Sequence, residues 1–272
     1  MQFNEKLDDI QIFTEKVYVD ADAIPNVQGL YFITKYKELM ERYYLARVYL
    51  SEIDTQDWDH WIKNNSEEMK KVAKIRLKAS FYETALIYYN IVVDLSWILV
   101  YASLETFVWS DEVAKEAFGF KSKEEAQNIL RHLEKDVGTP LTDDNQLNYL
   151  KKVDTEYGSK YRYVIEYVET FWKNIKDSSV RSNYNFIKHR GRLAYKEVVD
   201  LNYKQPIRIF LENKDGSKVP MPDCVNDVQK TTSLHDCIEE MKNFDDEILF
   251  PYIKNLVEQL DVIVKPSPVF DI

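Results

Sequence analysis

Glycine and proline are scarce in this chain: only 6 glycines and 8 prolines occur among its 272 residues. All-β folds and loops that cradle phosphates need glycine, because their backbones visit conformations that other residues avoid. The composition therefore favours long helices joined by few tight turns. No Walker A, GxGxxG or GxSxG pattern is present, which excludes readings built on those nucleotide-binding and serine-hydrolase motifs.

Cysteine and histidine are also rare, with 2 and 4 copies. Cys224 and Cys237 are too few for a disulfide framework, and the acidic N-terminus does not resemble an export signal, so we expect both to be reduced. The histidines show no HxxxH or HExxH spacing, and no CxxC pair occurs. We therefore expect no metal and no cofactor.

Positive charge is in deficit, because the formal net charge is −10. This excludes a general nucleic-acid coat protein, whose surface would be basic overall, but it permits a local basic pocket. The longest apolar run, residues 91–100, is broken by Asp94 and Ser96 and is far short of the roughly 20 residues that a membrane span needs. We expect a soluble, cytoplasmic protein without a membrane partner.

Apolar residues make up 45% of the chain, which is enough for one continuous core. The pattern predicts an all-α fold: a multi-helix bundle with a small β-hairpin insert, forming a single domain over residues 1–272. A loosely structured arm is expected over residues 1–28, and the insert over residues 204–224, with strands at 206–212 and 218–221 around an Asn-Lys-Asp-Gly-Ser turn. Helices are expected over 30–52, 66–109, 111–119, 122–138, 145–153, 160–175, 178–190 and 233–262, with a short helix at Trp58 and Trp61. Pro251 is expected to bend the last helix or to split it in two.

A polar stripe crosses the helix expected over 66–109. Its members are separated by 7, 4, 7 and 4 residues, so they share one helix face: Glu83, Asn90, Asp94, Tyr101 and Glu105. Asp94 has apolar neighbours on both sides, which predicts a buried carboxylate that needs a partner, with Arg181 or His189 as candidates. Such a pair is either purely structural or tunes His189 for proton transfer.

The most specific pattern lies in the helix expected over 178–190. Arg181, Asn185 and His189 are spaced i, i+4 and i+8, which places them along one side of the helix. Lys188 lies beside this row and Arg190 follows it. Arg181 and Lys188 are candidates to hold a phosphate, His189 to act as a general acid or base, and Asn185 and Arg190 to contact the ligand. The alternative is a polar seam that fixes how two helices pack.

This segment resembles the HEPN superfamily, whose members are all-α bundles and often metal-independent RNases. The family motif is an arginine, a polar residue that is often asparagine, and a histidine on a late helix, matched here by Arg181, Asn185 and His189. The seven residues between Arg181 and His189 exceed the family's usual spacing. The resemblance implies that His189 and Arg181 act on the scissile phosphate of RNA, and that two copies meet in a homodimer.

Three functions are consistent with these observations. The first is a HEPN-like nucleic-acid-processing protein, with RNA bound at a local basic pocket and with metal-independent RNase activity. The second is a non-enzymatic helical interaction protein whose polar seam is structural. The third is a protein that binds a small anionic ligand at Arg181 and Lys188. Exposure of Arg181, Asn185 and His189 in a cleft distinguishes the first and third from the second.

Overall fold

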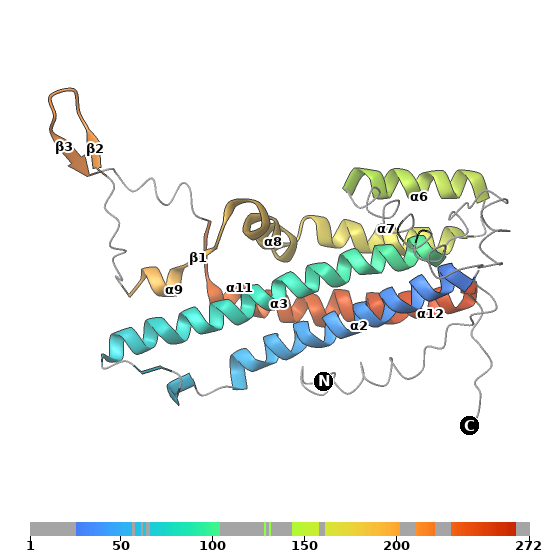
Figure 1. The fold of residues 1–272 in the computed structure, drawn as a ribbon, viewed down its shortest axis with the longest axis horizontal. Helices are drawn as coiled ribbons and strands as arrows, with labels where there is room; N and C mark the ends of the chain where they lie inside the picture. The colour runs from blue at the N-terminus through green and yellow to red at the C-terminus, as the bar shows by residue number, and fades with distance from the viewer. Residues whose placement is uncertain are drawn as a thin grey trace.

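The fold is known from a computed structural model, shown in Figure 1. It describes residues 26–55, 58–60, 62–63, 66–103, 128, 131, 143–157, 161–201, 210–220 and 230–264. The expectation of an all-α bundle with a small β insert is confirmed. The expected helices over 111–119 and 122–138 lie outside the described residues, apart from the helical positions 128 and 131.

Two long antiparallel helices form the centre of the bundle (Figure 1). They are α2 (Asn26–Thr55) and α3 (Glu67–Ser103). Helix α2 begins four residues before the expected start, so the last residues assigned to the N-terminal arm are helical. Helix α3 begins where the sequence indicated, because the hydroxyl of Ser66 accepts a hydrogen bond from the backbone N–H of Met69 at 3.3 Å.

Helix α3 is a long, apolar helix at the centre of the bundle. By length and composition alone it is suited to cross a membrane, but 67% of its apolar window is buried inside the structure. The side chains of Val92, Val93, Leu99 and Val100 are fully buried, as expected for a central bundle helix.

A third long helical segment runs beside this pair (Figure 1). It consists of α11 (Leu234–Phe244), the π-helical turn η4 (Asp245–Leu249) and α12 (Phe250–Val264). Pro251 lacks an N–H, and its ring would clash with the carbonyl four residues earlier in a regular helix. The wider π turn immediately before it accommodates this residue, so the expected bend takes the form of a local change in helix type.

Four further described helices cover one side of the bundle (Figure 1). They are α6 (Asp143–Tyr157), α7 (Arg162–Lys176), α8 (Ser179–Arg190) and the single turn α9 (Lys196–Val199). Aromatic rings fill the spaces between helices: Trp97 meets Trp172 edge to face at 6.0 Å between centroids, and Phe171 stacks on Tyr252. These aromatic contacts bury large apolar rings where the helices pack together.

Two small β pairs complete the fold. The expected hairpin is present, with β2 (Phe210–Glu212) antiparallel to β3 (Lys218–Pro220), and Gly216 adopts a φ of 81° in its turn. The second pair was not expected: β1 (Ala194–Tyr195) pairs in parallel with β4 (Thr231–Thr232). Parallel pairing joins segments distant in sequence, so no local turn signal announces it.

Candidate functional site

Helix α8 carries the residues that the sequence singled out. Ser178 caps its start, because its hydroxyl accepts a hydrogen bond from the N–H of Arg181 at 3.1 Å. The helix ends at Gly191, whose φ of 123° is a conformation that side chains other than glycine rarely adopt. Val180 and Asn183 are buried, so the N-terminal half of α8 is fixed in the bundle.

The side chain of Arg181 is held inside the bundle and is only 9% exposed. Its Nη1 donates a hydrogen bond to Oδ1 of Asn90 on α3 at 3.0 Å. The guanidinium also lies 5.5 Å from the ring centroids of Trp172 and Tyr184. Arg181 therefore connects α8 to α3 and α7, and its cation is not free to approach an external phosphate.

Asp94 lies near Arg181, with 3.9 Å between Asp94 Oδ1 and Arg181 Nη1. The structure thus brings together the two residues whose pairing the sequence suggested. The expectation that Asp94 is buried is wrong, because its side chain is 38% exposed. Its apolar sequence neighbours point in other directions, since consecutive helix residues are separated by about 100° around the axis.

Asn185, Lys188, His189 and Arg190 are all exposed. Four residues exceed one turn by about 40°, so the i, i+4, i+8 row of the sequence turns by about 80° from Arg181 to His189. That rotation moves the row from the core to the solvent. Arg181 and His189 consequently do not converge on one point within the chain.

The C-terminal turn of α8 carries a group of exposed basic side chains. Lys188, His189 and Arg190 occupy consecutive positions where the helix dipole is negative. The ammonium group of Lys188 lies 5.8 Å from the ring centroid of Tyr184. This group is accessible in a chain whose net charge is −10.

A lysine from another segment lies against the same helix. Lys230, which precedes β4, donates a hydrogen bond from Nζ to the hydroxyl of Ser182 at 2.9 Å. Ser182 is exposed and lies on the side of α8 that also presents Asn185 and His189, because the three are spaced i, i+3 and i+7. We call the exposed residues Ser182, Asn185, Lys188, His189 and Arg190 the α8 strip. Lys230 places an additional cation at its N-terminal end.

The polar stripe of α3 connects several elements to this helix. Glu83 accepts hydrogen bonds from the hydroxyl of Tyr195 at 3.0 Å and from Nε of Arg192 at 3.2 Å. Further along, Tyr101 packs on Tyr149 of α6, with ring centroids 4.8 Å apart. Asn90 accepts the hydrogen bond from Arg181, and Asp94 lies close to the same guanidinium. Glu105 lies outside the described residues. The stripe therefore fixes the elements that follow it in the chain.

A second polar cluster was missed by the sequence analysis. Arg47 on α2 and Asp245 in the π turn are both 0% exposed, and Nη2 of Arg47 lies 2.6 Å from Oδ2 of Asp245. The hydroxyl of Tyr43 donates to the other carboxylate oxygen at 2.6 Å. A signal for Arg47 existed: it lies on the same helical face as Tyr43 and Leu50, which belong to the apolar pattern.

A third cluster lies beneath α8. The side-chain amide of Asn183 donates to the hydroxyl of Tyr82 at 3.0 Å and approaches Sγ of Cys237 at 3.5 Å. The hydroxyl of Thr232 lies 3.1 Å from the same sulfur. Burial raises the pKa of the Tyr82 hydroxyl well above its usual value, so Tyr82 stays neutral and serves as a fixed hydrogen-bonding group.

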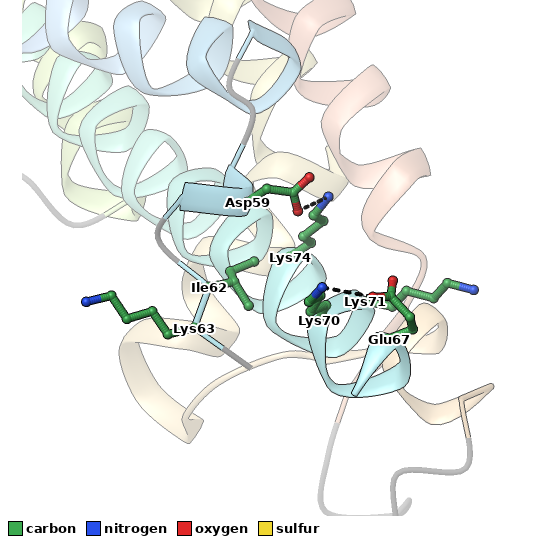
Figure 2. A pocket seen from close by; sticks show the side chains of 7 residues that line it. All are labelled: Asp59, Ile62, Lys63, Glu67, Lys70, Lys71 and Lys74. Carbon is green, nitrogen blue, oxygen red and sulfur yellow. Dashed lines mark hydrogen bonds and ion pairs between the residues drawn. The ribbon is translucent and has the colours of Figure 1, made fainter. Parts of the chain in front are cut away.

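Figure 2 shows a hollow between the turn η2 (Trp58–His60) and the start of α3. Its residues are mostly charged: Asp59, Ile62, Lys63, Glu67, Lys70, Lys71 and Lys74. Lys74 is paired with Asp59 at 2.6 Å and Lys70 with Glu67 at 2.8 Å, while Lys63 and Lys71 extend away from each other. The four ammonium groups do not converge, so the hollow does not form an anion-binding centre.

Metal binding has no candidate centre in the parts of the chain that the structure describes, where no group of three or more His, Cys, Asp or Glu side chains is close enough to hold an ion. The absence of a metal and of a cofactor in the functional protein remains a prediction. Comparisons with protein-family models, with curated proteins and with solved structures find no match to this chain.

Proposed function

We propose that this chain is a HEPN-like nucleic-acid-processing protein that contacts RNA through the α8 strip. The observation that carries the proposal is the exposure of Lys188, His189 and Arg190 at the end of a rigidly held helix. Cations on a fixed element attract phosphates without a large loss of conformational freedom on binding.

In this proposal the roles of Arg181 and His189 differ from those that the resemblance implies. Arg181 is hydrogen-bonded to Asn90 inside the bundle, so it acts as a positioning residue that fixes α8. The phosphate is held instead by the exposed cations Lys188 and Arg190. His189 is the group that exchanges a proton with RNA, which is the role that an imidazole fills at neutral pH.

The acidic character of the whole chain limits the extent of the contact. The net charge of −10 opposes the approach of a polyanion, so the proposed contact is confined to the α8 strip and the adjacent Lys230. The strip extends about 12 Å along the helix axis, since its ends are eight residues apart at 1.5 Å per residue. A short single-stranded segment therefore fits this surface better than a long duplex does.

Binding is tested by measuring the affinity for a short single-stranded RNA over a range of salt concentrations. The slope of log K against log salt is negative, and its magnitude falls by about 0.7 for each phosphate contact removed from a single strand. We expect Lys188→Ala/Arg190→Ala to reduce the magnitude of the slope by roughly 1.4 and to weaken binding. Lys173→Ala/Lys176→Ala, in the last turn of α7, removes the same charge from another exposed helix end and is the matched control.

Catalysis is tested separately, by incubating RNA with the protein in excess EDTA. Cleavage that persists in EDTA and is lost in His189→Ala supports a metal-independent RNase. Sedimentation in the presence of RNA shows whether two copies assemble, as the resemblance implies. If the folded protein binds RNA but never cuts a broad panel of sequences, the RNase part of the proposal is wrong and the binding part stands.

The second candidate is a non-enzymatic helical interaction protein, and the burial of Arg181 favours it. In this case the polar contacts of α8 only determine how the bundle packs. The outcome that selects it is equal and negligible RNA affinity in the wild type, the α8 variant and the α7 control. The third candidate, a small anionic ligand, is selected if inorganic phosphate competes with RNA at the α8 strip.

A further inference from the structure

The junction between α11 and α12 is irregular, and its irregularity coincides with a buried charge. In the π turn the N–H of Phe250 donates to the carbonyl of Asp245, five residues earlier rather than four. Asp245 is also the carboxylate that meets Arg47. One residue therefore both opens the π turn and forms the ion pair.

The π turn keeps two apolar faces aligned. On α11 the buried side chains include Leu234 and Met241, and on α12 they include Leu256 and Leu260. From Leu234 to Leu260 the chain contains about one residue more than seven turns of regular α-helix would take. Without the extra residue of the π turn, the face of α12 would be rotated by about 100° relative to that of α11.

The contacts of Arg47 depend on this alignment, because they lie at both ends of the π turn. Its Nε donates to Oδ2 of Asp245 at 2.8 Å, and its guanidinium lies 5.0 Å from the ring centroid of Phe250. It also lies 5.2 Å from the ring centroid of Tyr43 on its own helix. If the turn relaxed to a regular helix, Asp245 and Phe250 could not both keep these positions.

We propose that the Arg47–Asp245 pair is a register lock that holds the π turn and selects one docking of α12 against α2 and α3. Desolvation opposes the formation of a fully buried ion pair, so such a pair adds less to stability than its short distances suggest. Its effect lies in specificity: any other register leaves both charges buried without a partner. The apolar face of α12 alone does not discriminate so strongly between neighbouring registers.

The test compares two ion pairs that join the same two regions. Arg47→Met/Asp245→Leu replaces the buried pair by apolar side chains of similar size. Lys242→Met/Asp54→Leu replaces a pair between α11 and α2 that has a 2.6 Å contact but lies at the surface. Hydrogen exchange of residues 245–264 and the number of backbone amide signals in a ¹H–¹⁵N spectrum measure whether one register is populated.

For the buried double variant we expect a cooperative thermal transition close to that of the wild type. Amide exchange over residues 245–264 should be at least about tenfold faster, and their signals should be doubled or broadened, while the surface variant resembles the wild type. A buried variant with a single set of signals and unchanged exchange overturns the register lock. If that variant does not fold, Asp245→Asn decides: faster exchange confined to residues 245–264 supports the lock, and unchanged exchange overturns it.

Discussion

Two arginine–aspartate pairs join helices that are distant in sequence, and they differ in their surroundings. Arg47 and Asp245 are fully enclosed, with 2.6 Å between Nη2 and Oδ2, and Tyr43 satisfies the second carboxylate oxygen. Arg181 and Asp94 are 3.9 Å apart, and the carboxylate is 38% exposed. The two pairs therefore contribute differently to stability, because water reaches one pair and not the other.

The consequence for stability follows from the dielectric environment. An exposed carboxylate that loses its partner is solvated by water, whereas an enclosed charge that loses its partner has no substitute. Removing only one partner of the Arg47–Asp245 pair therefore costs much stability, because the other charge stays buried. Asp94, which water reaches, contributes little to stability. Arg181 lies between these limits, because it is buried but satisfied mainly by Asn90 and two aromatic rings.

The largest effect is expected at the enclosed pair. Asp245→Ala leaves the guanidinium of Arg47 buried without its carboxylate and should reduce the free energy of unfolding by about 3–5 kcal/mol. Urea denaturation followed by circular dichroism measures this loss. A decrease below about 1 kcal/mol would show that water enters the site and that the two pairs are equivalent.

Arg181→Met should have the next largest effect, about 2–3 kcal/mol, because the Oδ1 of Asn90 then lacks its charged donor. Methionine retains most of the apolar stem, so the decrease in the free energy of unfolding measures the contribution of the guanidinium group. Arg181→Lys keeps the charge but not the planar group that lies near Trp172, and should recover only part of the stability. Full recovery with lysine would mean that charge alone matters at this position.

The features that the sequence predicted are those that depend on residues close together along the chain. The long helices, the Ser66 and Ser178 caps and the β2–β3 hairpin were all indicated by local patterns. The parallel β1–β4 pair depends on a contact between distant segments, which local periodicity does not describe. For the same reason Arg47 was passed over, since its partner is 198 residues away.

The candidate site was predicted in part. The apolar neighbours of Asp94 predicted a partner, either Arg181 or His189, and the structure places Arg181 there. They did not determine which face of each helix is covered. Over eight helical residues the side-chain direction rotates by about 80°, so Arg181 and His189 do not point the same way. The packing of α8 on α3 then determines that Arg181 is the buried one. The assignment of catalytic and ligand-binding roles to Arg181, Asn185, Lys188, His189 and Arg190 stays a prediction.

Glu197 offers an intermediate case for the comparison, because its carboxylate is satisfied by donors at the start of α11. It accepts from the backbone N–H groups of Leu234 at 3.0 Å and His235 at 3.1 Å, and from the hydroxyl of Ser233. Partial burial raises the pKa of Glu197, but these hydrogen bonds outweigh it, so the pKa lies below its usual value of 4.5.

The sign of the pH dependence follows from that lowered pKa. The charged form is favoured in the folded state, so the contribution is present above the usual pKa of 4.5 and is lost as the pH falls through the lower folded value. Glu197→Gln should cost about 1 kcal/mol at neutral pH, and the difference from the wild type should shrink in acid. Glu212→Gln, in the exposed hairpin, is the control and should show neither effect.

Asp94→Ala should have the smallest effect, about 0.5 kcal/mol, since the exposed carboxylate contributes little and Arg181 keeps its bond to Asn90. Added salt should reduce even this difference, because screening acts on charges that water reaches. A double-mutant cycle with Arg181→Met measures the coupling between Arg181 and Asp94 directly. Coupling near zero, against a large value in the same cycle for Arg47 and Asp245, is the result expected if solvent access separates the two pairs. Coupling of several kcal/mol between Arg181 and Asp94 would contradict this view and would restore a functional interpretation of Asp94, in which the carboxylate holds Arg181 in place for chemistry at α8.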